Sequence, residues 1–219
     1  MNTMKVAIIT PVGPCADYRQ IAKCVQSVRD QSVRADHVLV FDGHKTTFSR
    51  RESDHAIFLP SAAGDFGDTP RAIGSIYAFG QGYDAVAWLD ADNWLREDHV
   101  EKCIAAHKDT GKPIICSGRR VVDYNERHEP QPCVEQVPGS GFYDTNTYFV
   151  HRDARGIVSV WFSMDPAQHV IGDRVLSATA TRHGILHCHY EPTVYYRSRL
   201  TFHYEQYNWP KDGVNLEVK

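Results

Sequence analysis

Apolar runs that alternate with amphipathic stretches dominate the first part of the chain. The segments 5–10 and 37–41 are mostly apolar, which is typical of strands that are buried on both faces. Between them, Ile21, Val25 and Val28 recur at helical spacing and lie on one face. Two such strands with a helix between them predict a parallel, right-handed βαβ unit.

The same plan continues in the next part of the chain. A shorter third strand is expected at 55–59, and the next helix should begin with Thr69 as its N-cap and Pro70 at its first position. This helix should close at Gly82, and the apolar run 84–89 then forms another strand. The predicted order so far is β-α-β-β-α-β.

The second half also alternates helices with strands, but less regularly. The polar stretch 123–141, rich in proline and glycine, is the expected mobile loop and the best candidate for a lid over an acceptor. The other expected elements are a helix at 97–108, one strand or two at 113–122, a strand at 142–150, a helix from 172 to 184, and strands at 185–187 and 193–196. The whole chain therefore predicts a single α/β domain with a mostly parallel central sheet flanked by helices.

Two carboxylates end the apolar run at 84–89. Asp90 and Asp92 stand where ligands gather in open α/β sheets, just beyond the carboxyl end of a strand. If the chain stays extended through Ala91, both side chains face the same way. Two convergent carboxylates suit a hard divalent cation that also binds substrate phosphates. The motif is short and common, however, and a polar turn with solvated acids would give the same pattern.

Composition and charge narrow the function classes. The 219 residues carry a formal net charge of −3, which gives no general reason to expect nucleic-acid binding. Pro11, Gly13 and Pro14 interrupt the first apolar run, so we expect no transmembrane segment or signal peptide, and a cytoplasmic protein. The six cysteines are scattered without a Cys-x-x-Cys pair and several fall on predicted core faces, which favours reduced thiols and argues against structural zinc.

Six short motifs follow one another in a characteristic order: Ile9-Thr10-Pro11-Val12, Val40-Phe41-Asp42-Gly43, Gly67-Asp68-Thr69-Pro70-Arg71, Trp88-Leu89-Asp90-Ala91-Asp92-Asn93, Gly172-Asp173-Arg174 and Tyr195-Tyr196-Arg197-Ser198-Arg199. In this order the chain resembles family 2 glycosyltransferases of the GT-A fold, a Rossmann-like α/β fold. The resemblance runs from Val6 to about Tyr204. Each motif is loose when taken alone, and the sequence of motifs carries the resemblance.

The resemblance implies an inverting, metal-dependent transfer of a sugar from a nucleotide diphosphate sugar to an acceptor hydroxyl. A UDP-sugar is the first expectation for the donor, a carbohydrate or other hydroxyl-bearing molecule for the acceptor, and Mn²⁺ or Mg²⁺ for the cofactor. The single domain 1–219 would then comprise a nucleotide-binding half (1–93), an acceptor and catalytic half (94–204) and a tail (205–219).

The resemblance also implies a donor-binding set in the first half. Thr10, Pro11 and Asp42 would contact the nucleobase and ribose, and Val12 belongs to the same motif. Arg71 would help to hold the nucleotide, since a guanidinium near a helix start can meet an anion.

The remaining implied residues carry the chemistry. Asp90 resembles the first carboxylate of the DXD motif, near the ribose and the metal, with Ala91 between it and the second. Asp92 resembles the direct ligand of the metal that bridges the diphosphate, and Asp173 resembles the catalytic base. The metal would stabilise charge on the departing diphosphate while the base deprotonates the acceptor hydroxyl.

Two positions depart from the family pattern. Gly172 stands where the family often has Glu before the catalytic Asp, and Arg199 stands where it often has His. Either Arg199 contacts the diphosphate directly or His203 replaces the missing metal ligand, and both interpretations remain open. The two rival functions are a nucleotidyltransferase, which would need a lysine-rich phosphate loop after the first strand, and a catalytically silent nucleotide-sugar-binding protein.

Overall fold

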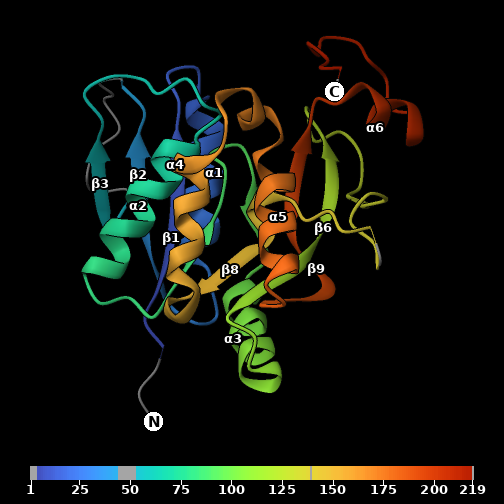
Figure 1. Ribbon diagram of the computed structural model, residues 1–219. Coiled ribbons are helices and arrows are strands. Elements are labelled where there is room, and N and C mark those ends of the chain that lie inside the picture. The colour runs from blue at the N-terminus through green and yellow to red at the C-terminus, as the bar shows by residue number, and fades with distance from the viewer. Residues whose placement is uncertain (1–3, 44–52, 139, 219) are drawn as a thin grey trace.

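A mixed sheet with helices on both faces forms the body of the protein (Figure 1). The computed structural model describes residues 4–43, 53–138 and 140–218. Gly139 of the predicted loop therefore lies outside the described residues, as do the termini of the predicted single domain. None of the described helices has the length and apolar character needed to cross a bilayer.

The elements have the following bounds. The strands are β1 (Val6–Val12), β2 (Ala35–Phe41), β3 (His55–Phe58), β4 (Ala85–Trp88), β5 (Trp94–Leu95), β6 (Ile114–Asp123), β7 (Gln131–Pro132), β8 (Tyr148–His151) and β9 (Leu186–Ser198). The α-helices are α1 (Tyr18–Arg29), α2 (Asp68–Gly80), α3 (His99–Thr110), α4 (Val160–Ser163), α5 (Gly172–Arg182) and α6 (Thr201–Gln206). Short 3-10 helices are η2 (Thr145–Thr147), η3 (Arg152–Ser159) and η4 (Pro166–Ile171).

The first half of the sheet is parallel, as predicted. Within the described residues the strand order is β3-β2-β1-β4-β8-β6-β9-β5, with β7 paired to β6. Strands β3, β2, β1 and β4 pair in parallel, so their carboxyl ends meet at one edge. The second half is mixed, because β8 runs antiparallel to both β4 and β6, whereas β9 runs parallel to β6.

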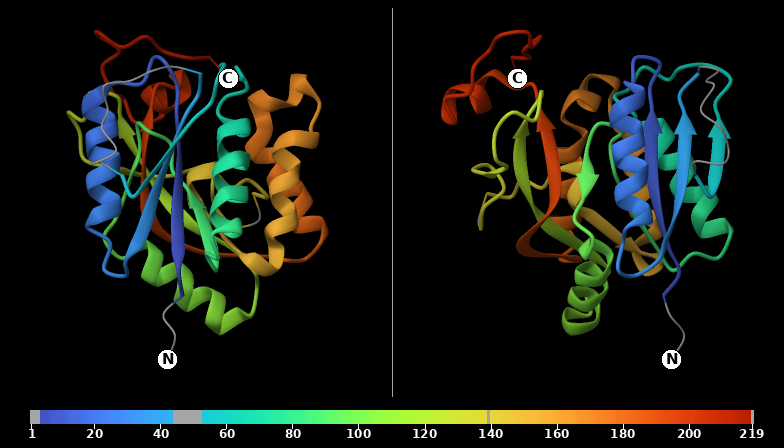
Figure 2. Two further views of the ribbon diagram at one scale, coloured as in Figure 1. Left: turned by 90° about the vertical axis from the view of Figure 1, so that its left-hand side faces the viewer. Right: turned by 180° about the vertical axis from the view of Figure 1, so that it is seen from behind.

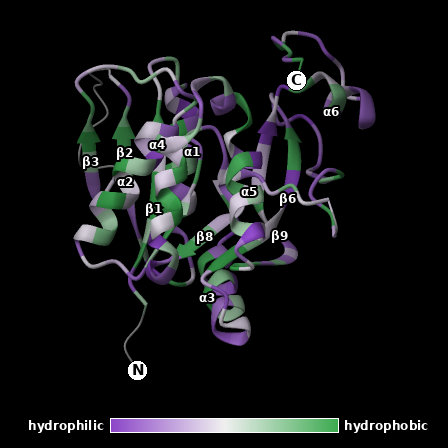
Figure 3. Ribbon diagram, viewed as in Figure 1, coloured by the Kyte–Doolittle hydropathy of each residue, from purple (hydrophilic) through white to green (hydrophobic). Residues whose placement is uncertain are grey.

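Alternation along β1 sends its side chains into two separate cores. Ile8 packs with apolar residues of α1 and α3, whereas Ile9 packs with those of α2, α4 and α5. Figure 2 shows these helices on opposite faces of the sheet, and Figure 3 shows hydrophobic residues concentrated in the strands between them. The sheet is therefore covered on both sides, which explains why its parallel strands are nearly continuous apolar runs.

Helix α2 lies close to the sheet because a glycine stands at the contact. A Cβ atom on Gly74 would lie 2.4 Å from Cγ2 of Ile9 and 3.0 Å from Cγ2 of Val40. A side chain at this position would push the helix outward. The close approach fixes the first turn of α2 at the carboxyl edge of the parallel strands.

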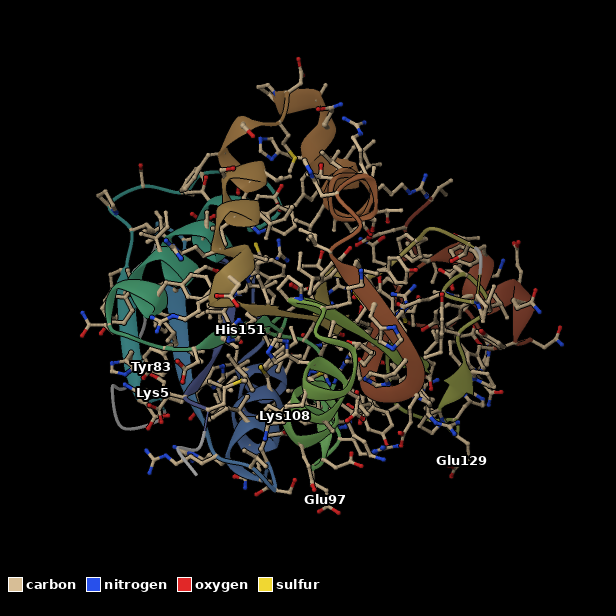
Figure 4. The ribbon with its side chains drawn as sticks, turned by 60° about the horizontal axis from the view of Figure 1, so that its bottom comes forward. Lys5, Tyr83, Glu97, Lys108, Glu129 and His151 are labelled. Atoms are coloured by element: carbon tan, nitrogen blue, oxygen red, sulfur yellow. The ribbon has the colours of Figure 1, made fainter. Side chains whose placement is uncertain are left out.

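The opposite edge of the sheet carries structural contacts. Figure 4 shows this end of the molecule, where the ammonium group of Lys5 lies 3.9 Å from the centroid of the Tyr83 ring. His151, labelled in Figure 4, stacks on the ring of His107, with centroids 4.4 Å apart. The first contact joins the start of β1 to the turn between α2 and β4, and the second joins α3 to β8.

Strand β1 is longer than predicted. It continues through Pro11 to Val12, although a strand ending at Thr10 was expected. Pairing with β4 stops at Ile9, so beyond that point β1 pairs with β2 alone. Pro11 is tolerated because one of its sides has no strand neighbour that needs its missing N–H.

The second half differs from the predicted elements in three places. The segment 113–122, expected as one strand or two, forms the single strand β6. The two strands predicted at 185–187 and 193–196 form one long strand, β9, whose pairing with β6 shifts register around Gly118 of β6. The strand predicted at 142–150 is confined to β8, because Asp144 caps the helix η2 before it. The predicted loop 123–141 contains β7, which pairs with β6.

The loop before α2 holds unusual backbone conformations. The predicted cap Thr69 is wrong: Gly67 is the N-cap, with φ of 89°, and Asp65 Oδ2 accepts a hydrogen bond from Thr69 N at 2.9 Å. The neighbouring Phe66 has φ of 59°, a left-handed conformation that is rare for a large side chain. The residue is nevertheless 70% exposed. A strained backbone and an exposed aromatic side chain at one residue indicate that Phe66 is present for a reason other than the stability of the fold.

We predict that Phe66→Gly stabilises the fold. Relief of the left-handed conformation should exceed the extra chain entropy of glycine, so the free energy of unfolding should rise by about 0.5–1 kcal/mol. Phe162→Gly is the matched control, because Phe162 is 51% exposed and lies in α4. That variant should lose about 1 kcal/mol in urea denaturation. A loss of similar size in both variants would show that Phe66 carries no strain.

Candidate functional site

A cleft of about 510 Å³ opens at the carboxyl edge of β1, β2 and β4. It lies at the end of the sheet toward which the arrowheads of β2 and β3 point in Figure 1. Its walls come from the ends of these strands, the loop before α2, the segment around η2 and the start of α5. The described residues that line it include Pro11, Asp42, Asp65, Phe66, Asp68, Arg71, Asp90, Asp92, Asp144, His169, Asp173, Tyr196 and Glu217.

The two carboxylates of the predicted DXD motif both line this cleft. The chain does not stay extended between them, because Asn93 N donates a hydrogen bond to Asp90 O at 3.0 Å and closes a turn. Asp90 is held from two sides. Its Oδ1 pairs with Arg71 Nη2, and its Oδ2 accepts a hydrogen bond from Asn146 Nδ2 at 2.9 Å. Asn146 Oδ1 accepts the backbone N–H of Asp90 in return.

Arg71 is a buried structural centre of the cleft. Its Nη1 donates to Phe66 O at 3.0 Å and to Asp68 Oδ1 at 3.1 Å, and its exposed fraction is 6%. Burial acts to lower the pKa of Arg71, but the carboxylates of Asp90 and Asp68 outweigh it and raise the pKa. Arg71 therefore positions Asp90 and the loop at Phe66 instead of projecting freely into the cleft.

Asp92 has a different environment from Asp90. Burial, followed by repulsion from Asp90, raises the pKa of Asp92 to about 6, and the positive charges of Arg197 and Arg199 oppose this shift. In the described residues no side chain donates a hydrogen bond to the Asp92 carboxylate. The two arginines thus compensate the ionised carboxylate of Asp92 only in part, and a bound cation would supply further positive charge.

Asp173 lies in the first turn of α5 and lines the cleft. The helix N-cap is Ile171, so Asp173 is not the capping residue. A side chain at Gly172, where the family often has Glu, has no space: a Cβ atom there would lie 2.9 Å from Asp68 Oδ2 and 3.1 Å from the Trp161 ring. The carboxylate of Asp68, which also accepts a hydrogen bond from His169 Nδ1 at 2.8 Å, occupies this place.

A second cavity of about 460 Å³ adjoins the first. The two share the residues Asp144, Val170, Asp173 and Tyr196. Asp173 therefore lies between two spaces that could each hold a ligand.

Of the first predicted motif, only Pro11 lines the cleft. Thr10 is buried on the α1 side, where its hydroxyl is 2.8 Å from His37 Nε2, and Val12 and Ala91 pack against α1 in an apolar cluster. Asp42 lines the cleft and accepts a hydrogen bond from Ala63 N at 2.9 Å. Side-chain contacts to a ligand can thus come from Pro11 and Asp42, while Thr10 and Val12 support the strand.

The two interpretations of the C-terminal motif differ in their fit to the structure. His203 is buried, with Nδ1 2.7 Å from Ser198 Oγ and Nε2 2.9 Å from Glu135 Oε2, so neither ring nitrogen is available to a metal. Arg199 stacks 4.4 Å over the Tyr124 ring, outside the residues that line the cleft. Within the described part of the chain, no group of three or more His, Cys, Asp and Glu side chains could hold a metal ion.

Several residues that line or support the cleft were not predicted from the sequence. Asn146 holds Asp90, His169 holds Asp68 from a position 101 residues away, and Glu217 reaches the cleft from the C-terminal segment. Asn146 and His169 belong to no recognisable motif, because their contacts arise only when η2 and η4 fold against the sheet. Asp68 belongs to the motif Gly67-Asp68-Thr69-Pro70-Arg71, and its position just before Thr69-Pro70 is the sequence feature that could have identified it as a cleft residue.

The cleft is strongly acidic. Among the described lining residues, one arginine and one histidine face eight carboxylates, which belong to Asp42, Asp65, Asp68, Asp90, Asp92, Asp144, Asp173 and Glu217. Arg71 is already paired with two of them. An anionic ligand would be repelled from such a cleft unless cations entered with it.

Residues 68–163 match the family model described as glycosyl transferase family 2. The matched segment contains α2, the Asp90 and Asp92 pair, and Asn146. Comparison with curated proteins found no match.

Solved structures share the fold over nearly the whole chain. Staphylococcus aureus TarS aligns with a TM-score of 0.66 and 14% identity, covering 98% of this chain and 41% of TarS. TarS 1–349 in complex with UDP gives a TM-score of 0.63 at 14% identity, covering 98% of this chain and 67% of that one. TarS 1–349 in complex with UDP-GlcNAc gives a TM-score of 0.65 at 14% identity, covering 89% of this chain and 59% of that one.

The chain thus spans less than half the length of full TarS. At this level of identity the alignment shows the fold, and the family match covers the segment that builds the centre of the cleft. The chain therefore shares the fold of the TarS structures, and its segment 68–163 is similar to glycosyl transferase family 2.

Proposed function

We propose that the chain transfers a sugar from a nucleotide diphosphate sugar, with a uridine nucleotide as the first choice, to an acceptor hydroxyl with inversion. The observation that carries this proposal is the convergence of Asp90, Asp92 and Asp173 on one cleft at the carboxyl edge of a parallel sheet. Two of the similar structures are complexes with UDP and UDP-GlcNAc, which supports a donor of this class.

We also propose that a divalent cation accompanies the donor. The acidic cleft would repel a diphosphate by itself, and the Asp92 carboxylate has the environment of a group that needs positive charge. Asp92 would hold the ion, because both oxygens of Asp90 are already engaged by Arg71 and Asn146. Bound Mn²⁺ or Mg²⁺ would supply charge stabilisation for the departing diphosphate.

In this proposal the chain's own residues orient the reactants and move the proton. Arg71 and Asn146 fix Asp90 at the floor of the cleft, while Pro11 and Asp42 line the side proposed for the nucleoside. Asp173 accepts the proton of the acceptor hydroxyl while the hydroxyl oxygen attacks the anomeric carbon. Inversion follows from attack on the side opposite the leaving diphosphate.

The main alternative is a binding protein of the same fold without activity. The replacement of the family Glu by Gly172 favoured it, but Asp68 places another carboxylate in that space. Hydrolysis of UDP-GlcNAc in the presence of Mn²⁺, assayed without acceptor, would separate the two functions. A silent binding protein should bind UDP and leave the donor intact.

The first prediction concerns Asp92. We expect Asp92→Asn to abolish the Mn²⁺-dependent part of UDP binding, because the neutral amide cannot provide the charge that holds the ion. Calorimetry with UDP, with and without Mn²⁺, measures this effect. Asp109→Asn on the exposed end of α3 is the control and should bind as the wild type does. Unchanged affinity in the Asp92 variant would remove Asp92 from the site.

The same substitution should stabilise the metal-free protein at pH 7.5. Because the folded-state pKa of Asp92 is raised to about 6 from 3.8, the ionised carboxylate disfavours the folded state, by an amount on the order of 1–3 kcal/mol. The wild type should regain this stability as the pH falls through about 6. Urea denaturation should therefore show a smaller difference in the free energy of unfolding between the wild type and the Asp92→Asn variant at pH 4.5 than at pH 7.5.

The second prediction concerns the nucleobase. If Pro11 and Asp42 line the nucleoside site, UDP should raise the thermal stability more than GDP, ADP or CDP does. A ligand at 100 times its Kd adds roughly 2.7 kcal/mol to the stability of the folded state. Thermal shift measurements with the four nucleotides and Mn²⁺ test this preference. Equal shifts for all four would contradict selection of the base.

The third prediction concerns Asp173. Asp173→Asn should lower kcat by roughly 10²–10⁴-fold, the usual range for loss of a general base, while donor affinity hardly changes. The variant should fold normally, since Ile171 and not Asp173 occupies the cap position. Turnover at saturating donor and acceptor is the measurement. A loss below about tenfold would exclude Asp173 as the base.

A further inference from the structure

The second cavity differs in character from the acidic cleft. Its rim carries Val170, Ile171 and Phe202, which are 48%, 38% and 38% exposed, and its walls include Phe142 and Leu200. These side chains come from η4, the segment before η2 and the start of α6. Apolar side chains that converge around a cavity and remain exposed are typical of a binding site for a ligand with an apolar surface.

The floor of this cavity is polar and fixed. Arg119 is 4% exposed, and it pairs with Asp144 through Nη1 and with Glu135 Oε1 through Nη2, at 3.0 Å in the latter case. Glu135 Oε2 also accepts a hydrogen bond from buried His203. The charge of Arg119 is therefore satisfied within the protein, and the carboxylates on the floor can still accept hydrogen bonds from ligand hydroxyls.

Asp173 joins the second cavity to the acidic cleft. A ligand hydroxyl beside Asp173 would thus face a donor in the acidic cleft, while the rest of that ligand lies in the second cavity. The acidic cleft suits a nucleotide with its cation, and the apolar rim suits a different molecule.

We infer that the second cavity binds the acceptor as a glycoside with a hydrophobic aglycone, its sugar hydroxyls toward Asp173 and the polar floor and its aglycone against Ile171, Phe202 and Phe142. This inference rests on the proposed function for the identity of the donor. In the transfer, the acceptor oxygen forms a bond to the anomeric carbon and the bond from that carbon to the diphosphate oxygen breaks. The bonding electron pair leaves with the diphosphate, and the hydroxyl proton passes to Asp173.

The test compares matched glycosides in binding. The probes are the 4-nitrophenyl and methyl β-pyranosides of glucose, galactose and N-acetylglucosamine, measured by saturation-transfer NMR with UDP and Mn²⁺ present. We expect at least one nitrophenyl glycoside to bind ten or more times as tightly as its methyl partner, with saturation strongest on the aromatic protons. UDP affinity is measured by calorimetry on the same samples.

Two variants locate the contact. Phe202→Ala and Ile171→Ser should each weaken nitrophenyl glycoside binding about fivefold or more and leave UDP affinity unchanged. Both side chains are partly exposed, so their replacement should not prevent folding. Phe162→Ala is the control, because this exposed residue lines neither cavity. It should bind both ligands as the wild type does.

Each outcome bears on one proposal. Equal affinity for the nitrophenyl and methyl glycosides, or no effect of either variant while UDP still binds, would overturn the acceptor inference and leave the proposed function standing. Tight binding of nitrophenyl glycosides that depends on Phe202 and Ile171, without binding of UDP, would support the apolar site and contradict the proposed donor.

Discussion

The buried guanidinium of Arg71 holds the proposed site together. It binds Asp90 after β4, Asp68 in the first turn of α2, and the carbonyl of Phe66 in the preceding loop. The loop before α2, the first turn of α2 and the end of β4 therefore meet at one cation. Loss of one partner from such a buried network leaves uncompensated charge, which commonly destabilises a protein by several kcal/mol. The position of Asp90 is consequently part of the fold, and Asp92 two residues later is left to respond to a ligand.

Periodicity predicted the part of the fold that depends on burial. The strands β1, β2 and β4 are buried on both faces, so their apolar runs identify them, and Asp42, Asp90 and Asp92 follow from where those runs end. The continuous β9 and the short β8 were not predicted. Their form depends on pairing with β6, a partner distant in the sequence. Local patterns carry little information about such pairings.

The same distinction applies to the candidate site. Residues that end strands or begin helices, such as Asp92 and Asp173, are visible in the sequence because a break in apolar periodicity marks them. Asn146 and His169 are not visible, since only the tertiary contacts with Asp90 and Asp68 give them a role. The interpretation of His203 as a metal ligand came from its place after a motif. Its burial against Glu135 and Ser198 could not be read from that place.

The structure explains why Gly172 stands where the family often has Glu. Judged by sequence alone, it removes a carboxylate from a catalytic motif and favours an inactive protein. In the structure, a Cβ atom at 172 would lie 2.9 Å from Asp68 Oδ2 and 3.1 Å from the Trp161 ring, so a side chain there would displace the Asp68 carboxylate. Asp68 also contacts Arg71 and, through His169, the segment that leads to Asp173. A carboxylate contributed by α2 thus links the two ends of the cleft, and the glycine is not by itself a sign of lost activity.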